Sequence, residues 1–137
     1  MKIVSIKLVL NDYTRINWLF GVYRYVYNKT LEAKNTKKTA NEMFEQLVRS
    51  TGWLQNEEIP RSLIKNAIHD AIKQKRPFAF IKKTSSRKKF RISTTSEIES
   101  FLKQYNIKQT NQDSNIIGIV VRRYKNKPTY AYLVVDK

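Results

Sequence analysis

The sequence of 137 residues lacks cysteine, has only three glycines and three prolines, and contains no long apolar run. Without cysteine the chain forms no disulfide or thiolate zinc site and has no cysteine nucleophile. No apolar run approaches the roughly 20 residues of a membrane-spanning helix. Ser5 and Lys7 interrupt the apolar stretch that a signal peptide would need. We therefore expect a soluble, intracellular protein without a membrane partner.

Groups suited to catalysis are also scarce. The single histidine, His69, is followed by Asp70, and neighbours in sequence do not share a helix face. The adjacent Glu57 and Glu58 are expected to favour the N-terminus of a following helix through its dipole. A two-metal nuclease site needs several carboxylates held together, whereas Asp136 stands alone near the C-terminus. The sequence therefore predicts a protein that is not an enzyme and uses no cofactor or metal.

Positive charge is abundant. Lys and Arg number 27 against 11 Asp and Glu, which gives a net charge of +16. Such an excess produces a strong positive potential, and nucleic acid is the commonest intracellular polyanion. Nine basic residues and no acid occur between Lys73 and Arg91. A membrane surface would instead require a basic amphipathic helix, and most of this stretch lies beyond the expected helices. Nucleic acid is the favoured partner, and a merely solubilising surface is the alternative.

The spacing of apolar residues in the first half predicts one strand followed by three helices. Alternation over residues 4–10 predicts the strand, and spacings of three and four over residues 16–31 predict the first helix. Thr39, three residues before Glu42, predicts a capping box at the start of the second helix. The third helix is expected within residues 60–77, with a proline at each end.

The second half of the chain is predicted to be mainly β-structure. Short β-prone runs lie at residues 78–81, 90–93, 116–123 and 129–135. The first two runs are expected to flank a basic loop at residues 84–89, and the last two to form a hairpin. Thr94 and Glu97 predict a second capping box, which starts a short helix.

A lone first strand cannot fold by itself, so we expect it to pair with the late strands. The three helices then form an insertion after the first strand. This arrangement is an α+β fold, with a small antiparallel β-sheet or barrel. Residues 1–10 and 77–137 are expected to form the β domain, and residues 11–76 the helical insertion.

Three groups of side chains are candidates for contact with nucleic acid. Arg, Lys and Asn together are the residue types that bind base edges in a groove, although a solvated helix face has the same composition. The first helix offers, off its apolar stripe, Arg24, Tyr25, Asn28 and Lys29. The polar face of the third helix offers Arg61, Ser62, Lys65, Asn66 and His69. The basic stretch offers Lys82, Lys83, Arg87, Lys88, Lys89 and Arg91.

The first of these helices carries the motif Gly-x-x-Arg-Tyr-Val-Tyr-Asn, at Gly21, Arg24, Tyr25, Val26, Tyr27 and Asn28. This motif resembles the N-terminal helix of the transposon-encoded nuclease TnpB and of its eukaryotic and viral relatives, the Fanzor proteins. A second similarity joins Trp53-Leu54 and Pro60 to the helix that follows. A third, less specific one is the basic stretch that ends at residues 89–93.

The resemblance implies a β-barrel wedge domain, interrupted after its first strand by a helical recognition domain. In the family, this N-terminal half binds the guide RNA and a short motif that flanks the DNA target. By matching positions, the contacts to that motif fall on Arg61, Ser62, Lys65, Asn66, Thr94 and Thr95. The nuclease domain of the family has no counterpart here, and the short helix after residue 94 is not expected from the family.

Two classes of function stay open. The first is a non-catalytic module that binds guide-type RNA, duplex DNA or both, of which a DNA-binding regulator is one form. The second is a protein-interaction or inhibitory module that mimics this half of the nuclease. A homodimer and a separate nuclease partner are both compatible with the first class. The expected location is the cytoplasm or nucleoid, or the nucleus for a eukaryotic or viral source.

Overall fold

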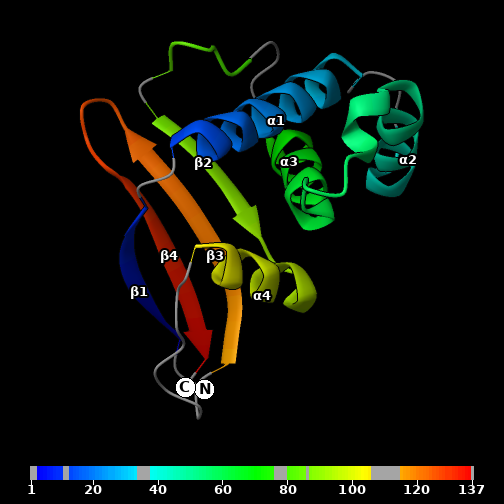
Figure 1. Cartoon of the computed structure of the whole chain (residues 1–137). Coiled ribbons are helices and arrows are strands. Elements are labelled where there is room, and N and C mark those ends of the chain that lie inside the picture. The colour runs from blue at the N-terminus through cyan, green and yellow to red at the C-terminus, as the bar shows by residue number, and fades with distance from the viewer. Residues whose placement is uncertain are drawn as a thin grey trace. The chain divides into compact units, whose positions relative to one another are not determined.

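The computed structural model describes residues 3–10, 13–33, 38–75, 80–85, 87–105 and 115–136 (Figure 1). The chain divides into two compact units, one combining Met1–Tyr13 with Ser86–Lys137 and the other consisting of Thr14–Ser85. The helical insertion was predicted at residues 11–76, whereas the second unit spans Thr14–Ser85. A four-stranded antiparallel sheet and several helices confirm the α+β class, and the sheet is open, not a closed barrel.

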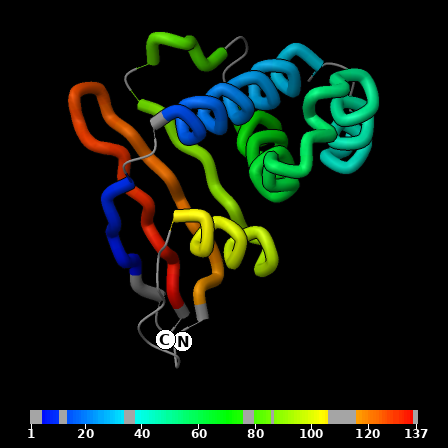
Figure 2. The backbone as a smooth tube through the Cα atoms, in the orientation of Figure 1, coloured from blue at the N-terminus to red at the C-terminus, as the bar shows by residue number. Residues whose placement is uncertain are grey.

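The sheet of the first unit joins the two ends of the chain. Its strands are β1 (Ile3–Leu10), β2 (Arg87–Ile92), β3 (Asn115–Tyr124) and β4 (Thr129–Asp136). Their order is β1-β4-β3-β2, and every neighbouring pair is antiparallel. Figure 2 shows β1, at the blue end of the colour scale, beside β4 at the red end. The prediction that the first strand pairs with the C-terminal hairpin is confirmed.

The predicted hairpin between β3 and β4 is also confirmed. Its turn is closed by the amide of Lys127, which donates to the carbonyl of Tyr124 at 3.0 Å. Asn126 in this turn has a φ of 63°, in the left-handed region that asparagine adopts more readily than most residues. The turn residues thus have the local chemistry that a tight connection between two strands requires.

One face of the sheet supplies the core of the first unit. Side chains alternate along a strand, so every second residue faces the core. The buried apolar strand residues are Leu10, Phe90, Ile92, Ile119, Val121, Ala131, Leu133 and Val135. Helix α4 (Thr95–Gln104) contacts β3, and Figure 1 shows it lying across that strand. Its own buried residues, Ile98, Phe101 and Leu102, account for this packing, since burying such side chains stabilises by about 1.5–3 kcal/mol each.

Two details of the β-rich half differ from the sequence prediction. Arg87, Lys88 and Lys89 belong to β2, because they pair with residues of β3. The loop expected at residues 84–89 is therefore shorter than predicted. Helix α4 lies where a helix was predicted, but the side chain of Thr94 makes no capping hydrogen bond, so the second capping box is wrong.

The strand expected at residues 78–81 is wrong where it can be checked. Phe80 and Ile81 lie in no strand, and residues 78–79 are outside the described part of the chain. The backbone N–H and carbonyl of Ile81 bond to the side chain of Asn28 instead of to a neighbouring strand. The amide side chain of Asn28 thus replaces the partner that a strand would have provided.

The second unit contains the predicted helices. They are α1 (Tyr13–Glu32), α2 (Ala40–Ser50) and α3 (Arg61–Lys73), with a short 3₁₀ helix, η2 (Gly52–Gln55), between the last two. The first capping box is confirmed, because the amide of Glu42 donates to Thr39 Oγ1 and the amide of Thr39 donates to Glu42 Oε1. Helix α3 ends at Lys73, and the proline expected to terminate it lies outside the described residues.

Tyrosine hydroxyls connect α1 to the region of α3. The hydroxyl of Tyr23 donates to the carboxylate of Asp70 at 2.6 Å, and Gln74 donates to the hydroxyl of Tyr27 at 3.0 Å. The rings of Tyr23 and Tyr27 are buried, so each side chain combines apolar packing with a satisfied polar end.

In the parts of the chain that the structure describes, no helix is both long and apolar enough to cross a membrane.

Candidate nucleic-acid interface

The face of the sheet opposite the core carries basic and aromatic side chains. Residues paired across antiparallel strands point to the same side, so the register assigns these side chains to rows. Three such rows make up what we call the open face: Arg87 and Tyr124; Lys89, Arg122, Tyr130 and Val9; Arg91, Val120, Tyr132 and Lys7. Helix α4 packs against the other side, where the apolar strand residues are buried.

All charged residues of the open face are basic. Its five basic residues come from β1, β2 and β3, and none of its ten positions holds an acid. Lys89 and Arg122 lie directly opposite each other on neighbouring strands, and both are exposed. Like charges in such a pair repel each other and destabilise the sheet.

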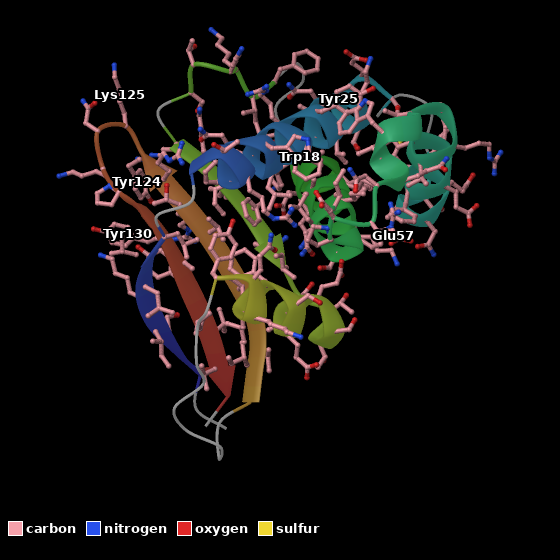
Figure 3. All side chains as sticks on the ribbon, in the orientation of Figure 1. Trp18, Tyr25, Glu57, Tyr124, Lys125 and Tyr130 are labelled. Atoms are coloured by element: carbon pink, nitrogen blue, oxygen red, sulfur yellow. The ribbon has the colours of Figure 1, made fainter. Side chains whose placement is uncertain are left out.

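Tyrosines lie among these charges. Lys7 Nζ is 4.0 Å from the ring centroid of Tyr130, and the Arg122 guanidinium carbon is 5.7 Å from that of Tyr132. The guanidinium carbon of Arg87 is likewise 5.7 Å from the ring centroid of Tyr124. Figure 3 shows Tyr124 and Tyr130 near the hairpin end of the sheet. Cation–π contacts at exposed sites contribute about 0.5–1 kcal/mol each, so they orient the side chains without fixing them firmly.

The residues of the basic stretch that lie on β2 point alternately to the two faces of the sheet. Arg87, Lys89 and Arg91 are on the open face, whereas Lys88 pairs with Arg123 on the side of the core. The structure thus brings three of the predicted residues together. Thr94 and Thr95, at the beginning of α4, are exposed and follow β2 directly.

Five basic or aromatic members of the open face were not predicted from the sequence: Lys7, Arg122, Tyr124, Tyr130 and Tyr132. They lie on three strands, and only the register of the sheet joins them to the basic stretch. A usable signal was present in the hairpin, where Arg122 and Tyr124, and then Tyr130 and Tyr132, are each two residues apart. Period-two spacing places each pair on one face of its strand.

The candidates on α1 make contacts within the second unit. The amide group of Asn28 donates to the carbonyl of Ile81 at 2.9 Å and accepts from its N–H at 2.8 Å. Lys29 Nζ lies 3.4 Å from Glu32, and Tyr25 packs edge-on against Trp53 at 4.9 Å. Arg24 is half-buried. These contacts give Asn28 and Tyr25 structural roles that the sequence did not predict.

The candidates on α3 do not form a common base-reading surface. Arg61 donates to the carbonyls of Leu54 and Gln55, at 2.5 and 3.1 Å, and so connects α3 to η2. Ser62 is buried, with only 5% of its surface exposed. Lys65 is exposed, with its Nζ 5.0 Å from the ring centroid of Phe44. Asn66 is half-buried and His69 is exposed on the same helix. Lys82 and Lys83, further along the chain, are exposed in a turn.

A pocket of about 400 Å³ lies between α1 and α2, and its walls include Lys29, Glu32 and Thr51. Lys29 and Glu32 are paired with each other, so the pocket presents no single charge to a ligand. Among the described residues, no group of three or more His, Asp or Glu side chains is placed to hold a metal ion. The open face is therefore the clearest concentration of binding groups.

No family model matches the chain, and no curated protein matches it. The resemblance to TnpB and Fanzor proteins is therefore one of sequence motifs alone.

Proposed function

We propose that the protein is a non-catalytic module that binds nucleic acid through the open face of its sheet. The observation that carries this proposal is the meeting of five basic and three aromatic residues in three adjacent rows of one sheet face, none of whose ten positions holds an acid. Basic side chains neutralise phosphates, and exposed aromatic rings provide surfaces for bases. The net charge of +16 adds long-range attraction to the same class of partner.

Within this proposal, the resemblance to TnpB and Fanzor proteins favours guide-type RNA, duplex DNA or both as natural ligands. The residues that β2 contributes to the open face agree with this expectation in one respect. Arg87, Lys89 and Arg91 belong to the basic stretch that carries the third similarity to the family. The α3 positions support it less, because the guanidinium of Arg61 is bonded to backbone carbonyls. We therefore assign the main contact surface to the sheet.

The experiment is a salt titration of oligonucleotide binding by fluorescence anisotropy. The test variant combines Lys89→Gln with Arg122→Gln, which lie opposite each other on the open face. Its matched control combines Lys103→Gln on α4 with Arg49→Gln on α2, two exposed residues outside that face. Both variants lose one Lys and one Arg, so they have the same net charge.

The proposal predicts that log affinity falls linearly with log salt, by about 0.9 per phosphate neutralised on duplex DNA and about 0.7 on a single strand. Lys89→Gln with Arg122→Gln lowers the slope by the amount expected for about two phosphate contacts, whereas the control variant leaves the slope nearly unchanged. A slope near zero for the wild type contradicts the proposal and favours a protein-interaction module. Equal loss in both variants would show that binding depends on net charge and not on the open face.

A further inference from the structure

We infer that the open face prefers single-stranded nucleic acid, because Tyr130 and Tyr132 form a platform on which two successive bases stack. This inference rests on the proposed function and specifies the form of ligand that the same surface takes. It depends on the placement of the two rings, on the charges beside them and on the difference between a single strand and a duplex.

The two tyrosines are placed along one central strand. They are two residues apart on β4, so both side chains point to the open face. Their ring centroids are 6.3 Å apart and the ring planes are inclined by 56°, so each ring takes a separate base. Both are half-buried, which means that the backbone and neighbouring side chains hold the rings while part of each ring reaches solvent. Aromatic residues on the open face of a four-stranded sheet are an established means of stacking two or three bases of RNA.

The charges surround the rings on both sides of β4. Lys7 on β1 and Arg122 on β3 are within cation–π distance of Tyr130 and Tyr132, respectively. Lys89 and Arg91 on β2 extend the positive surface beyond Arg122 in the same two rows. A base that stacks on either of these ring faces displaces the Lys7 or Arg122 side chain that lies over it, and the displaced cation is then available for the neighbouring phosphate. The tyrosines on β4 thus suit the bases of a nucleotide strand, and the basic residues on the neighbouring strands suit its phosphates.

A duplex fits this arrangement less well. Its bases are already stacked on one another, so the tyrosine rings reach no base face without unpairing. A single strand offers exposed base faces, and stacking on an aromatic side chain contributes about 1–3 kcal/mol per base, or roughly 5-fold to 150-fold in affinity. Duplex binding by this face is therefore limited to phosphate contacts. The alternative role of the two tyrosines is structural, as cross-strand neighbours that stabilise the sheet.

The test compares two double variants. Tyr130→Ile with Tyr132→Ile removes both rings but keeps apolar residues with high β-propensity. Tyr130→Phe with Tyr132→Phe keeps the rings and removes only the hydroxyls. Affinity is measured by anisotropy for a labelled oligothymidine and for a labelled DNA duplex at the same ionic strength. Circular dichroism melting accompanies each variant.

The expected result is that the Ile variant loses at least about tenfold in affinity for oligothymidine. Its duplex affinity stays within about twofold, and the Phe variant binds both ligands nearly as the wild type does. Unchanged oligothymidine binding by the Ile variant overturns the inference, as does an equal loss for both ligands or an equal loss in the Phe variant. These results leave the proposed function standing, whereas salt-independent or absent binding by the wild type refutes the proposed function itself.

Discussion

Lys7 Nζ lies 4.0 Å from the ring centroid of Tyr130, although the two residues belong to strands at opposite ends of the chain. The contact exists because β1 pairs with β4, and this pairing places Lys7 beside the tyrosines of the C-terminal hairpin. The N-terminal strand thus contributes both to the sheet and to the surface that we propose for nucleic acid. Its removal has consequences for both.

Deleting residues 1–10 is expected to reduce solubility. The deletion exposes the edge of β4, whose unpaired N–H and carbonyl groups can then pair with other chains. Size-exclusion chromatography after expression measures the effect, and the expected result is aggregated protein. A monomeric deletion variant that unfolds cooperatively would contradict the importance assigned to β1.

Asn28→Ala is expected to destabilise the protein by about 1–3 kcal/mol, because it leaves the N–H and carbonyl of Ile81 without the side chain that bonds both. Asn41→Ala on α2 is the matched control, since Asn41 is exposed. Denaturant unfolding measures both free energies. If Asn28→Ala keeps wild-type stability but weakens nucleic-acid binding, the contact role expected from sequence is correct and the structural role is not.

Arg61→Ala and Lys65→Ala should differ in a similar way. Arg61 bonds to the carbonyls of Leu54 and Gln55, so its loss leaves these acceptors to solvent and loosens the connection between η2 and α3. We expect Arg61→Ala to lower the free energy of unfolding by about 1 kcal/mol and Lys65→Ala to change it little. The family resemblance predicts instead that Arg61→Ala weakens binding to one preferred duplex by about 1–3 kcal/mol. A randomised duplex library assayed with folded protein distinguishes these outcomes.

Purified protein with magnesium or manganese is expected to cut neither DNA nor RNA. Two-metal cleavage requires clustered carboxylates, and the acidic residues of this sequence are few and scattered. Incubation with labelled substrates, followed by denaturing electrophoresis, provides the measurement. Divalent-dependent cleavage that remains constant per mole of protein through successive purification steps would contradict this prediction.

The sequence predicted the parts of the fold that depend on local pattern. Alternation over residues 4–10 and in the C-terminal hairpin identified three strands, and the Thr39–Glu42 capping box was correct. Strand β2 was shortened in the prediction because its first residues are all basic, so no apolar alternation marks them. Their strand conformation comes from pairing with β3.

The candidate site was predictable only in part, because its members are joined by register. Arg87, Lys89 and Arg91 were proposed from charge density, but Lys7 and Tyr130 are brought together only by the pairing of β1 with β4. The structural role of Asn28 could not be predicted from the sequence either, because the side chain bonds to the backbone of Ile81, a residue far along the chain. The sequence identifies an asparagine whose amide can bond to a base. That its amide bonds to backbone groups instead is known only from the folded structure.

The most direct test of the account is amide chemical-shift mapping by NMR during titration with oligothymidine. We expect the largest changes along β2, β3 and β4, at open-face positions such as Lys89, Arg122 and Tyr132. Smaller changes are expected on the polar face of α3, at Lys65 and His69. Changes concentrated on α3 with an unaffected sheet would contradict the proposal that the open face is the nucleic-acid interface.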